Sequence, residues 1–277
     1  MKTILTSKQI LEFQNSIYNF YKKNQRQFIW RDDITAYKIL ISEVMLQQTQ
    51  TSRVIAKFEQ WLKIFPDFTT LAQASNLDIL TAWQGLGYNR RGLALGTIAQ
   101  KVIRDHQGIL PCDVQILQTF PAIGPNTAGS ICAFAFNHPT IFIETNIRTV
   151  FTYHFFKEQN NVSDKQLLPY IQATLDHNNA REWYYALMDY GVFLKKQLPA
   201  INAKSKHYAK QSQFLGSKRQ VRGLLIKILT QVSIIDIQTM IEMVEFELPT
   251  NQHNIEKIIQ LLVDEKIIRQ EGQLLSL

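Results

Sequence analysis

The chain has only two cysteines, Cys112 and Cys132, among its 277 residues. Two thiols are too few for a four-cysteine iron–sulfur cluster or zinc ribbon, so the sequence excludes both within this chain. It also lacks an apolar run of the roughly 18 residues that a membrane span needs. Its first residues lack the basic and apolar segments of a signal peptide. We therefore expect a cytoplasmic protein without membrane contact, in which a disulfide is not favoured.

Acidic residues are absent from one long segment of this basic chain, whose formal net charge is +7. Between Tyr190 and Ile235 there is no Asp or Glu, whereas nine Lys and Arg residues fall within this segment. These nine are Lys195, Lys196, Lys204, Lys206, Lys210, Lys218, Arg219, Arg222 and Lys227. The segment is either a solvated linker face or a surface that binds phosphates. From Asp236 onward the balance reverses, with eight acids against three basic residues.

Apolar residues at alternate positions are scarce before the last ten residues, and a spacing of three to four residues dominates. Ile10, Phe13, Ile17 and Phe20 show this helical spacing near the amino terminus. Proline and glycine separate such segments along the chain, as at Pro66. The pattern predicts an all-α protein of many short helices without an internal repeat.

The end of the chain carries the strand signals. We expect three helices and two short strands, near 221–230, 235–244, 251–263, 267–269 and 273–276. This order predicts a small winged-helix-like domain over 221–277, after a basic linker over 201–220. The candidate recognition helix, 251–263, has acidic neighbours that repel phosphates. DNA reading by this domain and contact with a protein partner both remain open.

Two carboxylates stand in apolar surroundings. Glu43 lies within "ISEVMLQQTQTS", and Glu144 follows Phe142 and Ile143 in "FIETNIRTVF". An unpaired buried charge is costly and tends to take up a proton, so each residue is solvated, paired or functional. For Glu43 the structural alternative is an ion pair with a nearby base such as Arg31.

The segment "FPAIGPNTAGSICAFAF", residues 120–136, predicts a helix end, a tight turn and a second helix of small residues. Pro125 suits the first position of a helix, and Gly124 permits a positive φ in the turn. The unpaired N–H groups at the start of the second helix can face a phosphate. The segment therefore predicts a helical hairpin that is able to contact a nucleic acid backbone.

Together with "WRDDITAYKILISEVMLQQTQTSRV", "WQGLGYNRRGLAL" and "WYYALMDYG", these segments occur in one order over about residues 28–195. In this order they resemble the helix-hairpin-helix DNA glycosylases, most closely those that remove adenine opposite 8-oxoguanine. The resemblance implies two helical domains around a DNA cleft. One would be formed by 1–29 and 134–200, and the other, with the hairpin, by 30–133.

The resemblance implies a role for each carboxylate. The acid at the position of Glu43 protonates a ring nitrogen of the extruded base, and an apolar setting keeps its proton available near neutrality. The carboxylate at the position of Glu144, usually Asp, stabilises the positive charge that develops on the sugar. Asn146 and Asn126 are counted with them as catalytic residues, and the paired acids parallel those of glycoside hydrolysis.

The resemblance also implies contacts to DNA and to the base. Leu86 and Tyr88 align with a wedge that fills the gap left by the flipped nucleotide, although capping a turn is their alternative role. The other expected DNA contacts are Gln47, Gln48, Thr49, Gly124, Thr127, Lys204 and Lys206. The base pocket is expected to include Trp30, Arg31 and Asp189, for which plain core packing of Trp30 and a helix-surface position of Asp189 are the alternatives.

The chain departs from the family pattern at four places. Asn126 stands where bifunctional relatives of the endonuclease III type carry a lysine nucleophile, which favours a monofunctional enzyme. Adenine-specific members usually have Tyr or Ser there. Glu144 is one methylene longer than Asp. After "MDYG", the four-cysteine loop that binds an iron–sulfur cluster in the family is replaced by a lysine-containing segment. The family's larger carboxyl-terminal domain, which inspects 8-oxoguanine, is not recognisable.

We therefore expect a monomeric, nucleoid-associated base-excision-repair glycosylase that acts on mismatched or damaged double-stranded DNA. With only two cysteines and the cluster loop replaced, we expect no iron–sulfur cluster, no other cofactor and no catalytic metal, while a monovalent cation bound at the hairpin stays open. Adenine opposite 8-oxoguanine or guanine is the expected substrate. The scaffold also fits uracil, mismatched thymine or hypoxanthine. A non-catalytic DNA-binding protein, and a protein that docks partners through its acidic carboxyl-terminal domain, are the alternatives from other functional classes.

Overall fold

The computed structural model describes residues 4–209 and 213–277. It confirms the all-α prediction, since the described residues form fifteen α-helices, one 3-10 helix and a small three-stranded sheet. Within these residues no helix is long and apolar enough to cross a membrane. Positions 210–212 of the predicted linker, including Lys210, lie outside the described residues.

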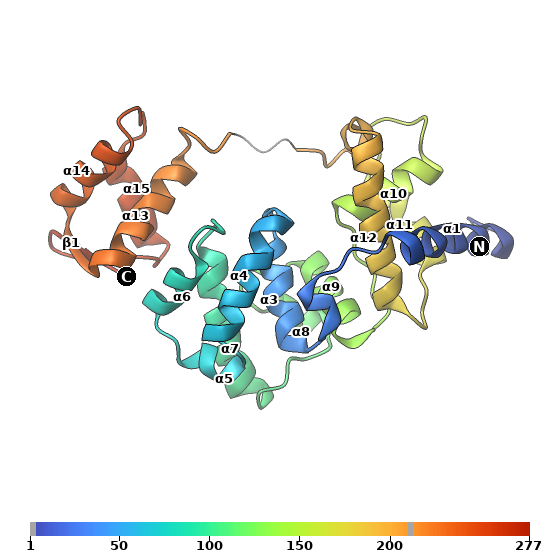
Figure 1. Cartoon of the computed structure of the whole chain (residues 1–277), viewed down its shortest axis with the longest axis horizontal. Coiled ribbons are helices and arrows are strands. Elements are labelled where there is room, and N and C mark those ends of the chain that lie inside the picture. Colours follow the sequence, from blue (N-terminus) through green and yellow to red (C-terminus); the bar gives the residue numbers. More distant parts are fainter. Residues whose placement is uncertain (1–3, 210–212) are drawn as a thin grey trace. The chain divides into compact units, whose positions relative to one another are not determined.

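The contacts divide the chain into two compact units, each discontinuous in sequence (Figure 1). Unit 1 lies within 1–43, 111–119 and 123–210, and unit 2 within 44–110, 120–122 and 211–277. The division into domains expected from the sequence stays a prediction. Helix α3, Ala36–Leu46, begins in unit 1 and ends in unit 2.

Unit 1 is built around α12, whose contacts reach α1, α9 and α10. Its elements are α1 (Ser7–Asn24), α2 (Ile29–Asp32), α8 (Val114–Gln118), α9 (Pro125–Phe136), α10 (Thr145–Phe155), α11 (Asp164–Thr174), α12 (Ala180–Gln197) and the 3-10 helix Ile201–Lys204. Trp183 and Tyr184 of α12 are fully buried, so this helix forms much of the core. A Cβ at Gly191 would lie 2.6 Å from the Asn146 backbone oxygen, and glycine therefore permits the close approach of α12 and α10.

The first part of unit 2 packs around α7. It contains α4 (Thr51–Ile64), α5 (Phe68–Gln73), α6 (Asn76–Trp83) and α7 (Arg90–His106). Two glycines on α7 allow its neighbours to approach, because a Cβ at Gly92 would meet Trp83 at 2.8 Å and one at Gly96 would meet Ile79 at 2.5 Å. Trp61 and Trp83 are fully buried and meet edge to face at 5.6 Å.

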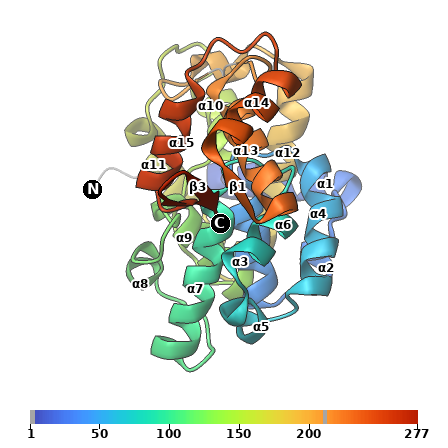
Figure 2. The same cartoon turned by 90° about the vertical axis from the view of Figure 1, so that its left-hand side faces the viewer.

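The rest of unit 2 is the carboxyl-terminal domain, three helices and a small sheet (Figure 2). Its elements are α13 (Lys218–Val232), β1 (Ile234–Asp236), α14 (Ile237–Glu247), α15 (Ile255–Asp264), β2 (Arg269–Glu271) and β3 (Leu274–Ser276). The strands are antiparallel in the order β1-β3-β2. This arrangement confirms the predicted winged-helix-like domain.

The sequence prediction was wrong at several borders of this domain, and its third helix, expected from 251, begins at Ile255. A helix was expected from residue 235, but Ile234–Asp236 form β1, and α14 begins after Asp236, which caps it by accepting from Gln238 N–H at 2.8 Å. The first strand of the final hairpin starts two residues later than expected. Ile267 and Ile268 are only 1% and 2% exposed, so they serve the core before the strand begins.

Candidate active site

Glu43 lies on α3 in unit 1, between buried neighbours. The hydroxyl of Ser130, on α9, donates to Glu43 Oε2 at 2.5 Å. Burial raises the pKa of Glu43 from 4.5 to about 7, the bond from Ser130 lowers it, and the negative charge of Glu144 raises it. A carboxyl with this pKa holds its proton in a large fraction of molecules near neutral pH, as a general acid requires.

Ser130 can satisfy both protonation states of Glu43. Its Oγ lies 3.0 Å from the carbonyl of Thr127 as well as 2.5 Å from Glu43. When Glu43 is ionised, the hydroxyl donates to the carboxylate. When Glu43 is protonated, the acid can donate to Oγ while the hydroxyl turns to Thr127. The same heavy-atom geometry therefore serves the acid before and after it loses its proton.

Glu144 is the N-cap of α10. Its Oε1 accepts from the backbone N–H of Ile147 at 2.8 Å, and its Oε2 accepts from Asn146 Nδ2 at 3.1 Å. Burial raises the pKa of Glu144, while the Ile147 amide and the positive charge of Lys195 oppose that rise. The position at a helix N-terminus favours the ionised form too. Burial thus raises the pKa of both carboxylates, and Glu144 differs from Glu43 in the backbone and side-chain donors that hold both of its oxygens.

Asn126 and Asn146 hold the backbone and side chain around Glu144. Asn126 Oδ1 accepts from the N–H of Ile143 at 3.1 Å, directly before Glu144. Asn146 Oδ1 is buried and has no hydrogen-bond partner among the described residues. Asn126 is therefore placed to position the chain that carries Glu144, and Asn146 contacts the carboxylate itself.

Asp189, on α12, is only 3% exposed, so the helix-surface alternative is wrong. Its carboxylate accepts from Arg26 N and Nε at 2.8 and 2.7 Å and from both terminal nitrogens of Arg31 at 3.0 Å. Arg31 also lies over the ring of Tyr185 at 4.3 Å. Its ion-pair partner is thus Asp189 rather than Glu43. Trp30 is buried and stacks on Phe28 at 4.9 Å.

The expected DNA contacts before the hairpin lie in unit 2. Gln47 Nε2 donates to the Ala122 carbonyl at 3.0 Å, and Gln48 has a positive φ of 54°. Leu86 is 4% exposed, whereas Tyr88 is 42% exposed and also has a positive φ, 48°. Of the two expected wedge residues, Tyr88 therefore offers its side chain to a ligand in this structure.

Arg91 was missed by the sequence analysis, although it stands in the quoted segment "GLGYNRR". Its guanidinium donates to the carbonyls of Val44 at 2.8 Å and of Leu86 and Gly87 at 3.1 Å, and to Thr49 Oγ1 at 3.0 Å. These contacts join the end of α3 to the loop that carries Tyr88. The one sequence feature that pointed to Arg91 was its position as the second of two arginines just before an apolar helical segment.

In the hairpin the second helix begins where the sequence predicted, whereas the turn before it differs from the prediction. Helix α9 begins at Pro125, as expected. Gly124 has a φ of −88° and needs no glycine conformation, so the expected positive φ is wrong there; Ala122 takes it, with a φ of 61°. Thr127 accepts from Ser130 through its carbonyl.

The two expected lysine contacts lie at the end of the 3-10 helix Ile201–Lys204 and just after it. Lys204 Nζ donates to the Lys157 carbonyl, while Lys206 is exposed. Within the described residues no group of three or more His, Cys, Asp or Glu could hold a metal ion. The expected lack of a cofactor and the monovalent cation at the hairpin stay predictions.

The comparisons with known proteins agree with this geometry. Residues 41–168 match the family described as HhH-GPD superfamily base excision DNA repair protein. An adenine DNA glycosylase of Mycobacterium tuberculosis is 38% identical over 132 residues, 47% of this chain and 43% of that protein. One of Buchnera aphidicola is 32% identical over 186 residues, 66% of this chain and 53% of that protein. The chain spans about half the length of these curated relatives.

Solved structures show the same fold. A thermostable thymine-DNA glycosylase aligns with a TM-score of 0.59 and 23% identity, covering 66% of this chain and 86% of that one. Endonuclease III in a non-covalent DNA complex aligns with a TM-score of 0.53 and 16% identity, covering 77% and 92%.

Proposed function

We propose that the chain is a DNA glycosylase, because residues 41–168 match the HhH-GPD superfamily of base excision DNA repair proteins and its relatives carry the name adenine DNA glycosylase. It would hydrolyse the N-glycosidic bond of a base turned out of the duplex. The observation that carries the proposal is the pair Glu43 and Glu144 within unit 1, one acid with a pKa of about 7 and one carboxylate held by donors.

In the first step Glu43 transfers its proton to a ring nitrogen of the base. The C1′–N bond then breaks, its electron pair leaves with the base, and the base departs as a neutral molecule. A pKa near neutrality suits this step, because the acid is protonated often enough and still gives up its proton readily. Ser130 accommodates the carboxylate that remains.

The loss of the base leaves positive charge on the sugar. The Glu144 carboxylate is fixed by the Ile147 amide and by Asn146, so its negative charge is already oriented when the sugar charge develops. Water then adds to C1′ and releases a proton that restores Glu43. The product is an abasic site.

We further propose that the enzyme is monofunctional. The side chain of Asn126 is an amide, which cannot form the Schiff base through which a lysine cleaves the strand. Its Oδ1 is also engaged by Ile143 N–H. Borohydride trapping tests this point: we expect no covalent adduct with DNA, and an adduct would contradict the assignment.

The proposed substrate is adenine opposite 8-oxoguanine or guanine in double-stranded DNA. Support comes from the relatives in two bacteria that carry the name adenine DNA glycosylase.

Single-turnover base release tests the function. The panel contains adenine opposite 8-oxoguanine, adenine opposite guanine, uracil or thymine opposite guanine, and hypoxanthine. We expect release from an adenine duplex, its loss in Glu43→Gln, and wild-type release in Glu59→Gln, a matched change at an exposed glutamate of α4. Release of another base would keep the glycosylase and replace the substrate. Tight binding of DNA without release of a base from any duplex would contradict the proposal that the chain is an enzyme.

A further inference from the structure

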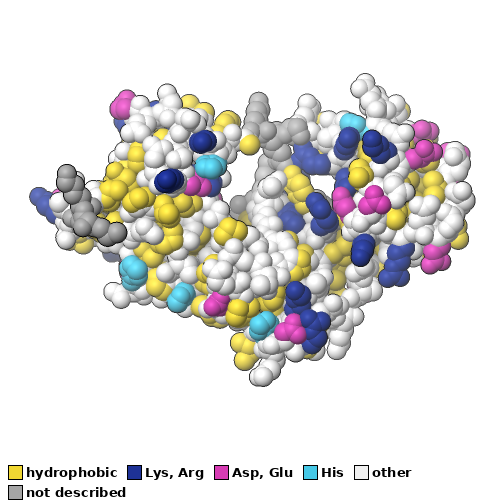
Figure 3. Space-filling model, turned by 180° about the vertical axis from the view of Figure 1, so that it is seen from behind, with side chains coloured by type: hydrophobic (Ala, Val, Ile, Leu, Met, Phe, Trp, Pro, Cys, Tyr) yellow, Lys and Arg dark blue, Asp and Glu magenta, His cyan; other side chains and the backbone are white. Residues whose placement is uncertain are grey.

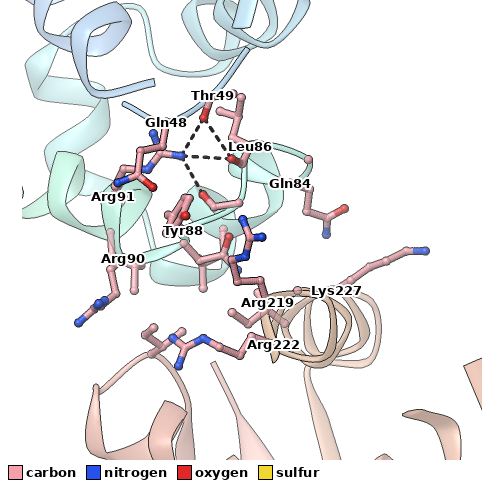
Figure 4. Close-up of a pocket in the computed structure, with 18 of the residues that line it drawn as sticks. Gln48, Thr49, Gln84, Leu86, Tyr88, Arg90, Arg91, Arg219, Arg222 and Lys227 are labelled. Carbon is pink, nitrogen blue, oxygen red and sulfur yellow. Dashed lines mark hydrogen bonds between the residues drawn. The ribbon is translucent and has the colours of Figure 1, made fainter. Parts of the chain in front are cut away.

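Unit 2 contains a groove of about 1540 Å³ between the loop before α7 and the carboxyl-terminal domain (Figure 4). One wall is formed by 47–50 and 84–91, which include the expected DNA contacts Gln48 and Tyr88. The other wall is formed by Phe214 and the first half of α13. The carboxyl-terminal domain therefore shares a cavity with the loop that carries Leu86 and Tyr88, here called the wedge loop.

The two walls are joined by both apolar and polar contacts. Leu80 of α6 is buried in the same apolar cluster as Leu225 and Leu229 of α13. Gln84 Nε2 donates to Thr230 Oγ1 across the contact. Arg222 forms a bidentate ion pair with Glu265, and Arg90 Nε approaches the same carboxylate at 3.6 Å. These contacts give the groove a defined width within unit 2.

The lining is strongly basic. Seven Lys and Arg residues and two acids contribute to it: Arg53, Arg90, Arg91, Arg219, Arg222, Lys227, Lys266, Glu247 and Glu265. Glu265 is already compensated by Arg222 and Arg90. In Figure 3 the carboxyl-terminal domain, on the right, shows several dark-blue basic side chains, with magenta acids both among them and at its outer edge. The groove therefore attracts a polyanion.

Each wall also presents an aromatic ring beside a guanidinium. Tyr88 is 42% exposed and lies 5.3 Å from the Arg91 guanidinium carbon, while Phe214 is 54% exposed and lies 6.0 Å from that of Arg219. Arg219 extends from α13 toward the loop of Tyr88 (Figure 4). Rings that stack with bases, interleaved with cations that meet phosphates, are typical of sites for a nucleic acid strand.

We propose that this groove binds a DNA strand, and that α13 supplies its carboxyl-terminal wall through Arg219 and Lys227. The helix at the usual recognition position of a winged-helix domain, α15, is not the contact in this assignment. The identity of the polyanion as DNA rests on the proposed function, whereas the site itself rests on the charge, rings and cavity. The domain thus adds phosphate contacts next to the wedge loop.

Binding of the full chain to an undamaged duplex tests the assignment. The double variant Arg219→Gln/Lys227→Gln removes two charges from the groove. Lys257→Gln/Arg269→Gln removes two exposed charges from the same domain outside the groove. The logarithm of the DNA association constant falls with the logarithm of the salt concentration. Losing two phosphate contacts makes this dependence less steep by about 1.8 and weakens binding about thirtyfold at 0.15 M salt. We expect these changes in the groove variant and neither in the control.

Equal losses in both variants, or an unchanged slope in the groove variant with a wild-type thermal midpoint, would overturn the inference. The second result would assign the groove to another ligand, such as an acidic protein segment. Lys227→Gln alone, at an exposed position, should lower the slope by about 0.9. The wild-type chain's base release is measured separately, so a failure of the proposed enzyme leaves the binding result standing.

Discussion

Replacing Ser130 by alanine should move the pH profile of base release upward. The Ser130 hydroxyl donates to Glu43 at 2.5 Å and so lowers the pKa of that carboxyl, which burial otherwise raises. Alanine removes the donor without adding volume. The ionised form of Glu43 then loses a stabilising interaction, and its pKa rises above about 7.

The size of the shift follows from the strength of the hydrogen bond. A bond to a charged group contributes about 1.5–3 kcal/mol, and the bond that Ser130 accepts from the protonated acid contributes about 0.5–1.5 kcal/mol. The net loss is therefore about 1–1.5 kcal/mol, and since one pKa unit corresponds to about 1.4 kcal/mol, a shift of about one unit is expected. An acid with a pKa of 7 is protonated in about a tenth of molecules at pH 8, and one with a pKa of 8 in about half. Base release at pH 8 should therefore increase about fivefold, while release below pH 6 stays unchanged.

The assay is single-turnover base release between pH 5.5 and 9, on the duplex from which the wild-type enzyme releases a base fastest. Ser16→Ala is a matched control, because its hydroxyl donates to the Phe13 carbonyl on α1 without contacting a carboxylate. Glu43→Gln sets the background. If the falling limb of Ser130→Ala stays at the wild-type pH or moves below it, Ser130 does not set the pKa of Glu43. That result would refute the reasoning.

Four further changes test other parts of the structure. Because the pKa of Glu43 is raised from 4.5 to about 7 in the folded chain, wild-type stability falls between these pH values. Glu43→Gln should therefore be more stable than wild type at pH 8 by up to about 3 kcal/mol and equal to it at pH 4, as measured by urea unfolding. Asp189→Asn should destabilise unit 1 by about 3–5 kcal/mol, since Arg26 and Arg31 lose their buried partner; an unchanged thermal midpoint would contradict this. Arg91→Lys should cost about 3 kcal/mol and weaken DNA binding, because one ammonium cannot replace its contacts to four backbone carbonyls and Thr49. Gly191→Ala should lower the thermal midpoint and slow base release, since the new Cβ meets the Asn146 backbone at 2.6 Å; wild-type release would show that Asn146 need not stay in place.

Local features of the sequence predicted local features of the fold. The start of α9 at Pro125 follows from proline alone, and the helical spacing of Phe13 and Ile17 gives the buried face of α1. Strand β1 escaped prediction because Ile235 pairs with Leu275 of β3, a residue at the far end of the domain. The positive φ assigned to Gly124 belongs to Ala122, since nothing in the sequence of a turn fixes which residue reverses the chain.

The two carboxylates of the proposed site could be picked out from the sequence, whereas the residues that contact them could not. Glu43 and Glu144 stand out because a carboxylate within an apolar segment needs an explanation. Ser130 is 87 residues from Glu43 in sequence, and Asp189 is 158 from Arg31, so these partners become visible only when the helices are packed. The contacts of Arg91 were hidden for the same reason, since its acceptors come from the end of α3 and from the loop that carries Tyr88.

The side chain of Glu144 is one methylene longer than the aspartate usual in the family, so the sequence alone leaves the position of its carboxylate open. The packing around α10 fixes that position. Ser, Thr, Asp and Asn are the usual N-caps, because a short side chain reaches the amide at the third helical position. Glu144 makes that contact with Ile147 through one oxygen, and its other oxygen reaches Asn146. With both oxygens held, the additional methylene gives the carboxylate no added freedom. The residue that departs from the usual aspartate is therefore held at both oxygens, which is the fixed orientation that the proposed role of stabilising a developing positive charge needs.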